Sequence, residues 1–172
     1  MVGLERGTVE LEPYQDEWQD HYETEVQRLT DIAGEWLLDF EHIGSTAIEG
    51  MVAKPIIDIL AIVEDLDDKN DLLPILKDHG YEQRPDEVKG RLFLAKGPQT
   101  NRTHYLSLTE EGSDFHREKL AFRNYLRNHP EAAEQYASLK KRLVETHSED
   151  RNKYTAEKGE FIQNILNRTM DK

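Results

Sequence analysis

The residues whose types and spacing could do chemistry are concentrated between positions 41 and 60. A turn of small residues, Gly44-Ser45-Thr46, is followed in the next apolar run by a single carboxylate, Asp58. A Gly-Ser turn that leads into a helix can present backbone N–H groups and a hydroxyl to phosphate oxygens. A carboxylate on the neighbouring strand can then hold Mg²⁺ against the same phosphates. The alternative is a turn without a chemical role and an Asp58 that pairs with a backbone N–H or an arginine, because an unpaired buried carboxylate is costly.

Four basic residues recur at helical spacing beyond position 113. They are His116, Lys119, Arg123 and Arg127. Steps of three, four and four place them along one stripe of a predicted helix. Such a stripe could form an electropositive wall facing phosphates near Ser45, with arginine binding them bidentately. The alternative is a solvated face that forms ion pairs with acidic side chains on neighbouring helices.

Three further residues are candidates for the same site. Lys54 precedes Pro55 at the entry to an apolar strand, and Arg102 and His104 stand at the start of a later one. Lys54 and Arg102 could neutralise phosphate, and His104 could bind a ligand or act as an acid or base. Each also has a simpler explanation, namely an exposed loop lysine, a surface ion pair and a structural hydrogen bond.

Composition limits the class of partner. The 172 residues carry 22 basic and 35 acidic side chains, a net charge of −13, which argues against general binding to nucleic acid through its phosphate backbone. A small anionic ligand held by a local basic cluster remains compatible with this charge. The chain has no cysteine, so thiol catalysis and cysteine-based zinc sites are absent. Without a membrane-spanning stretch or a signal-peptide pattern, we expect a soluble, cytoplasmic protein.

Hydrophobic periodicity predicts one α/β domain over residues 1–172, with a mixed α/β core in 1–112 and a helical part in 113–172. Strands are expected at 8–12, 40–43, 55–63, 81–84, 91–96 and 103–109, and helices at 18–32, 67–79 and from 113 onward, with breaks at 128–130 and 147–150. The apolar 55–63 segment is typical of a central strand buried on both faces. Ser113 and Asp150 are expected helix N-caps.

The stretch "EHIGSTAIEGMVAKPIIDIL" resembles the signature of the GrpB family, which is placed in the nucleotidyltransferase-like superfamily. Four other segments fit the family in the right order: "VELEPYQDEW", "RTHYLSL", "LAFRNYLRNHPEAAEQYASLKKRL" and "DRNKYTAEKGEFI". The resemblance implies a nucleotidyltransferase-like mixed β-sheet flanked by helices, with a helical C-terminal part. Tyr154 and Lys158 match its C-terminal motif, although helix packing and a surface charge would also explain them.

In the superfamily that this chain resembles, two carboxylates separated by one residue bind metal beside the Gly-Ser turn. Asp58 matches the first position, but Leu60 occupies the second and cannot bind Mg²⁺. The later strand offers His104 without an acid, and Asn124 stands where many relatives carry Asp. Two functions are therefore predicted. One is an Mg²⁺-dependent nucleotidyltransferase with Asp58 as metal ligand and Asp58 and His104 as catalytic residues. The other is a non-catalytic module that binds a nucleotide or another phosphorylated small molecule.

Either function predicts the same set of ligand-binding residues. They are Gly44, Ser45, Thr46, Lys54, Arg102, Lys119, Arg123, Arg127, Tyr154 and Lys158. We expect a cleft near the C-terminal end of the 40–43 strand, lined by Ser45, Asp58, His104 and Arg123, with Asp58 facing into it.

Overall fold

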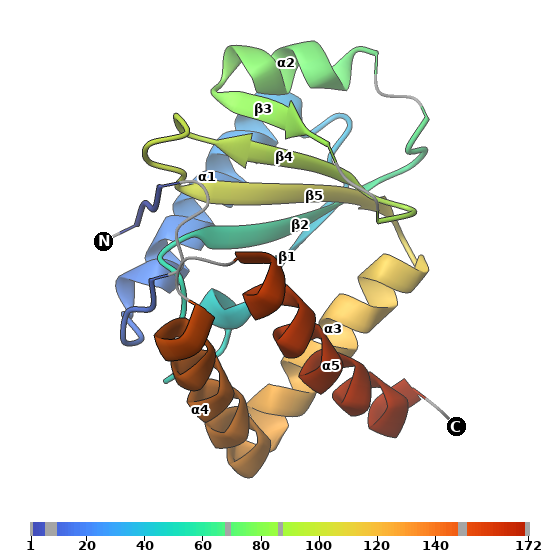
Figure 1. The fold of residues 1–172 in the computed structure, drawn as a ribbon. Coiled ribbons are helices and arrows are strands. Elements are labelled where there is room, and N and C mark those ends of the chain that lie inside the picture. The colour runs from blue at the N-terminus through green and yellow to red at the C-terminus, as the bar shows by residue number, and fades with distance from the viewer. Residues whose placement is uncertain (1, 6–9, 68–69, 86–87, 148–150, 171–172) are drawn as a thin grey trace.

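A computed structural model describes residues 2–5, 10–67, 70–85, 88–147 and 151–170, with the side chains of 146–154 outside the description. Its centre is a five-stranded sheet in the order β1-β2-β5-β4-β3 (Figure 1). The strands are β1 (Asp39–Ile43), β2 (Ile57–Val63), β3 (Tyr81–Arg84), β4 (Leu92–Lys96) and β5 (His104–Glu110). β2 and β5 pair in parallel, and every other neighbouring pair is antiparallel.

Helices cover both faces of the sheet, as Figure 1 shows. They are α1 (Glu17–Ala33), α2 (Leu72–Asp78), α3 (Asp114–Asn128), α4 (Pro130–His147) and α5 (Arg151–Met170). α1 and α2 lie on one face, and α3, α4 and α5 gather on the other. The predicted mixed sheet flanked by helices, with a helical C-terminal part, is confirmed.

β2 is a central strand because its side chains are apolar in both directions. Ile57, Ile59 and Ala61 face α1 and α2 and belong to the largest core cluster. Leu60 and Ile62 face the other way, toward Phe115 at the start of α3. Burial on both faces explains the near-continuous apolar sequence of this strand and leaves Asp58 as its exception.

The amphipathic helices follow their predicted bounds closely. α1 buries Trp18 and Leu29 against the sheet, on the stripe that the spacing indicates. α3 begins after Ser113, whose hydroxyl accepts a hydrogen bond from the His116 N–H, so the predicted N-cap is confirmed. Asp150, the other predicted N-cap, lies outside the described residues.

Two predicted elements are shorter than expected. α2 begins only at Leu72, which places Pro74 in the first turn, where its missing N–H has no intrahelical partner to lose. The 8–12 strand is reduced in the described residues to one bridge between Glu12 and Ala53. None of the helices in the described part of the chain has the length and apolar character that crossing a membrane requires.

Candidate functional site

A pocket of about 260 Å³ lies where the C-terminal end of β1, the N-terminal end of β2 and helices α3, α4 and α5 meet. Four lysines contribute to its wall, so we call it the lysine pocket: Lys54, Lys119, Lys140 and Lys158. Seven of the predicted site residues line it, namely Gly44, Ser45, Thr46, Lys54, Asp58, Lys119 and Lys158. The acids of its lining are Asp58 and Glu118, so lysine is in excess.

The Gly44 backbone and the Asp58 carboxylate are in close contact at the entrance to β2. Gly44 has φ of 73°, and a Cβ at this position would lie 2.9 Å from Asp58 Oδ2. Both the left-handed conformation and the lack of space therefore require glycine here. The turn continues only as a single 3₁₀ turn, η1 (Ser45–Ala47). The phosphate-binding interpretation assumed a helix after this turn, and the structure has one 3₁₀ turn in its place.

Asp58 faces the lysine pocket, as predicted. It pairs with Tyr105 on β5 and lies on the face of the sheet that carries α3 to α5. Burial raises the pKa of Asp58, and the nearby cations Lys119, Arg91, Lys158 and Lys54 oppose that rise in this order. The buried acid is thus surrounded by positive side chains.

The residues beside Asp58 do not fit a pair of Mg²⁺ ions. Leu60, two positions along the same face, is fully buried in an apolar cluster with Ile43, Ile62 and Phe115. In the described part of the chain, no group of three or more His, Asp or Glu side chains is arranged to hold a metal ion. Asp58 supplies only one carboxylate ligand, and the neighbouring cations repel a divalent ion.

A cation lies on this same face of the sheet. The Arg91 guanidinium stacks between the rings of Phe93 and Phe115, 4.7 and 4.9 Å from their centroids. It donates to Ser107 Oγ at 3.3 Å, and Ser107 pairs with Leu60 across β2 and β5. β5 extends to Glu110, one residue beyond the predicted strand, but Glu110 is at the opposite end of the strand from Tyr105, the partner of Asp58. Beside Ser107 it is arginine that supplies charge, and this charge is positive.

A buried lysine that the sequence analysis missed contacts the Gly-Ser turn. Lys140 on α4 is 1% exposed, and its Nζ hydrogen-bonds to Ser45 Oγ at 2.7 Å and to the Val52 carbonyl. Tyr136, one turn earlier, places its ring 4.8 Å from this nitrogen and hydrogen-bonds to Ser45. Burial, helped by Lys158 and Lys54, lowers the pKa of Lys140 to about 6. The available signal was helical spacing, since Lys140 lies between the core residues Tyr136 and Leu143 on one face.

The hydroxyl of Thr46 also has a fixed partner. His42 Nε2 lies 2.9 Å from Thr46 Oγ1, and its Nδ1 lies 3.3 Å from Gln19 Oε1. With the amide oxygen of Gln19 accepting from Nδ1–H, Nε2 must accept the Thr46 proton. Thr46 can then offer a ligand only its lone pairs, which favours a donor group over a phosphate oxygen.

His104 and Arg102 do not reach the lysine pocket. His104 pairs with Ile57 in the β-sheet register and therefore faces α1, the opposite side of the sheet from Asp58. Its ring is bonded to Thr103 Oγ1, and burial lowers its pKa to about 4. Arg102 is fully buried and donates to the Gly97 carbonyl and to Glu82. The predicted shared cleft is wrong for His104 because adjacent strand residues point to opposite faces.

The basic stripe of α3 divides among three environments. Lys119 lines the lysine pocket. Arg123 is 8% exposed and binds Glu41 at 2.7 Å and the His42 carbonyl at 3.0 Å, so it joins α3 to β1. Arg127 donates twice to the Ala47 carbonyl. Arg123 therefore does not line the cleft as predicted, since Glu41 already engages its guanidinium. Tyr154 lies outside the residues with described side chains.

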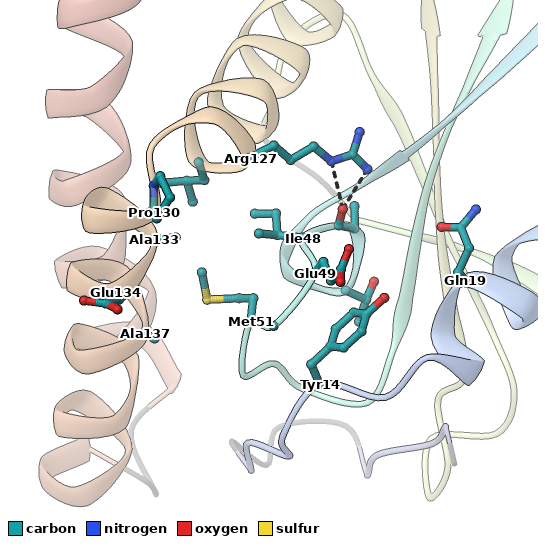
Figure 2. Close-up of a pocket in the computed structure, with 14 residues that line it drawn as sticks. Tyr14, Gln19, Ile48, Glu49, Met51, Arg127, Pro130, Ala133, Glu134 and Ala137 are labelled. Atoms are coloured by element: carbon teal, nitrogen blue, oxygen red, sulfur yellow. Dashed lines mark hydrogen bonds between the residues drawn. The ribbon is translucent and has the colours of Figure 1, made fainter.

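A second pocket lies on the other side of the turn, with a volume of about 660 Å³ (Figure 2). Arg127, Glu49 and Tyr14 supply polar groups to it, and Met51 and Ile48 supply apolar contacts. A large pocket with both polar and apolar groups is the usual first choice for a ligand site. Here it lacks the combination of Asp58, Ser45 and several lysines, and its acids, Glu49 and Glu134, outnumber its single arginine. We therefore place the candidate site in the smaller pocket.

Comparison with known proteins agrees with this architecture. Residues 8–168 match the GrpB protein family. The chain is 37% identical over 172 residues to the Glutamate-rich protein GrpB of Alkalihalophilus pseudofirmus, which covers 97% of this chain and 99% of that protein. It superposes on the crystal structure of the conserved protein GrpB from Enterococcus faecalis with a TM-score of 0.82 and 36% identity, over 92% of this chain and 98% of that one. The chain therefore belongs to the GrpB family.

A more distant likeness is found to Cid1 poly(U) polymerase bound to Mg 3′-dATP. The TM-score is 0.49 at 12% identity, over 78% of this chain and 42% of that one. This level is too low to support a conclusion about the present chain.

Proposed function

We propose that the lysine pocket binds a phosphorylated small molecule, such as a nucleotide, without needing a protein-bound metal ion. The observation that carries this proposal is the setting of Asp58. A lone carboxylate lies among Lys119, Lys158 and Lys54 where a metal site would need a second acid, and Leu60 fills that second position.

The pocket has the groups that phosphate recognition needs. Ammonium groups are point charges that neutralise phosphate oxygens, and Ser45 borders the space that those oxygens would occupy. Three lysines reach the pocket from separate elements: Lys54 from the loop before β2, Lys119 from α3 and Lys158 from α5. In a chain of net charge −13, such a local excess of lysine is expected where an anion binds.

The pocket also limits the size of the ligand. Its volume of about 260 Å³ lies at the small end of ligand sites. Phe122, Ile162 and Leu166 give it an apolar wall beside the lysines. This combination suits phosphate groups attached to a compact organic part, and the net negative charge disfavours a nucleic acid.

Of the two predicted functions, the binding module is favoured over Mg²⁺-dependent nucleotidyl transfer. In that reaction two metal ions align the attacking and leaving oxygens. Holding both ions requires carboxylates at positions 58 and 60. Mg²⁺ carried in by a nucleotide would have only Asp58 to bind, against the repulsion of the neighbouring cations. We therefore expect Mg²⁺ to weaken or leave unchanged the affinity for a nucleotide.

The test is isothermal titration calorimetry with ATP, ADP, AMP and a hexose phosphate, each in EDTA and in MgCl₂. We expect binding in EDTA, and a loss of about 10- to 150-fold in affinity for Lys119→Met, since an ammonium–phosphate contact contributes about 1.5–3 kcal/mol. Lys141→Met removes an exposed lysine on α4 and is the matched control. Binding that requires Mg²⁺ would restore the metal-dependent function, and an absence of binding to every ligand would refute the proposal.

A further inference from the structure

We propose that Ser45 and Lys140 form a nucleophile–base pair, through which Ser45 accepts a phosphoryl group from a phosphoanhydride bound in the lysine pocket. This inference rests on the proposed function, because it takes the bound phosphorylated molecule as the donor. It adds a covalent step and a modification site to the binding pocket.

The first support is the contact between the two side chains. Ser45 follows β1 in the η1 turn, and Lys140 lies in the middle of α4, yet Ser45 Oγ and Lys140 Nζ are only 2.7 Å apart. A serine hydroxyl becomes a nucleophile when an adjacent base can take its proton at this distance. Ser45 itself lines the pocket, so the hydroxyl borders the space that a donor would fill.

The second support is the surroundings of the lysine. Lys140 is 1% exposed, and within the described part of the chain the charged groups that act on it are Lys158 on α5 and Lys54 before β2, both of them cations. Tyr136 is the neighbouring titratable group on its own helix. A buried ammonium without an acidic partner is unfavourable, whereas a buried neutral amine is not.

The hydrogen-bond partners of Lys140 also accommodate the neutral amine. A neutral amine has two N–H donors and one lone pair. The Val52 carbonyl can take one donor, the Tyr136 ring face can take the other, and the lone pair can accept the Ser45 proton. This arrangement satisfies both donors of the amine and leaves the lone pairs of Ser45 Oγ for a ligand in the pocket that Ser45 lines.

The pKa shifts of Lys140 and Tyr136 agree with a neutral amine and a protonated tyrosine. Burial lowers the pKa of Lys140 to about 6, so at neutral pH the amine is mostly unprotonated and can act as a base. Burial raises the pKa of Tyr136, which keeps its hydroxyl protonated.

The step is a displacement at the terminal phosphorus of the donor. The Ser45 Oγ–P bond forms, the bond from phosphorus to the bridging oxygen breaks, and the leaving diphosphate or carboxylate keeps the bond electrons. The Ser45 proton moves to Lys140, which becomes an ammonium beside the new phosphoserine dianion. Lys54 and Lys158 stabilise the charge on the phosphoryl oxygens, as cationic clamps do in phosphoryl transfer.

The test is incubation of the full chain with acetyl phosphate or ATP in EDTA, followed by intact mass and peptide mass spectrometry. We expect the mass of one added phosphoryl group, located at Ser45. Ser45→Ala should abolish it, Ser138→Ala on the exposed side of α4 should not, and Lys140→Met should slow it by roughly a hundredfold, the scale of general-base catalysis. Calorimetry on the same samples separates the two proposals: binding without modification overturns the nucleophile alone, and no binding overturns both.

Lys140→Met could fail to fold because the side chain is buried, so the wild-type pH profile is a second criterion. The rate of modification should rise with pH, reach half its maximum near pH 6 and then level off, as Lys140 loses its proton. A rate that is flat across this range, or modification at a residue other than Ser45, would overturn the pair.

Discussion

The two faces of the sheet differ in the partners that surround a carboxylate and in the direction in which its pKa is shifted. Under α1, Glu25 is 4% exposed and accepts hydrogen bonds from Lys96 at 2.8 and 2.9 Å and from the Tyr81 hydroxyl. Burial alone would raise the pKa of Glu25, but the hydrogen bonds from Lys96 and Tyr81 outweigh it and lower the pKa. Under α3 to α5, Asp58 lies among several cations, and its pKa is raised.

This difference distinguishes a structural network from a binding site. The Glu25 carboxylate is hydrogen-bonded to the Lys96 ammonium and the Tyr81 hydroxyl, and Arg28 lies 3.8 Å away at the more exposed edge; a satisfied network of this kind stabilises the fold. The lysine pocket instead gathers four lysines around two acids. Charged groups with perturbed pKa values, such as Asp58, Lys119 and Lys140, concentrate at functional sites. We therefore expect variants of the first face to change stability and variants of the second face to change ligand affinity.

The largest expected effect is in the balanced network. Glu25→Ala leaves the Lys96 ammonium, 18% exposed, without its carboxylate. We expect the unfolding free energy to fall by about 3 kcal/mol, the low end of the range for removing one partner of a buried ion pair, because Lys96 is partly exposed to solvent. Urea unfolding measures this change, and calorimetry should show unchanged phosphate affinity. A stable variant with weakened phosphate binding would reverse the roles that we assign to the two faces.

The second prediction concerns pH and the histidines of the α1 face. Burial lowers the pKa of His104 to about 4 and that of His42 to about 3, from an ordinary value of 6.5. Between pH 6.5 and about 4 the unfolded chain binds protons that the native protein does not, so stability is lost as the pH falls. The slope is about 1.4 kcal/mol per pH unit for each histidine. His104→Asn should remove one histidine's share of the slope in urea unfolding curves, and an unchanged slope would place the titration elsewhere.

The third prediction tests the unbalanced face. Asp58→Asn removes an acid whose folded pKa is raised, and such an acid destabilises the native state above that pKa. The variant should therefore be more stable than the wild type at pH 7, and the difference should shrink as the pH falls and Asp58 becomes protonated. Phosphate affinity should rise severalfold, because the substitution removes the repulsion between the Asp58 carboxylate and the phosphate, which is on the order of 1 kcal/mol. Loss of an Mg²⁺-dependent gain in nucleotide affinity would instead identify Asp58 as a metal ligand.

Most of the fold could be predicted from the sequence because it depends on local patterns. The apolar run that ends at Val63 indicates a buried strand, and the helical spacing of Trp18 and Leu29 indicates the buried face of a helix. Each pattern can be recognised within a single element. The Gly44–Asp58 contact was also predictable, since a turn and a strand close in sequence share few possible arrangements. Strand alternation could have placed His104 on the far face, but that step requires knowing which residue of β2 it pairs with.

The site residues that were predicted wrongly or missed have partners that are far away in the sequence. Arg123 pairs with Glu41, 82 positions away, and Lys140 bonds to Ser45, 95 positions away. No spacing rule connects such residues, because the partner depends on how α3 and α4 cross the sheet. The sequence shows that a helix stripe is basic, but only the packing decides that Lys119 faces a pocket while Arg123 is neutralised.

The smallest expected effect is that of a change at Arg127, which tests whether the two pockets on either side of η1 are independent. Arg127 is exposed and holds the Ala47 carbonyl with two guanidinium N–H groups, at 3.0 and 2.7 Å (Figure 2). Arg127→Lys keeps the charge and loses the paired donors, so unfolding free energy should fall by less than about 1 kcal/mol. Phosphate affinity should not change, because Lys140 holds Ser45 from the other side of the turn. If calorimetry shows a severalfold loss of affinity, the η1 turn links both pockets, and the pocket of Figure 2 then belongs to the binding site.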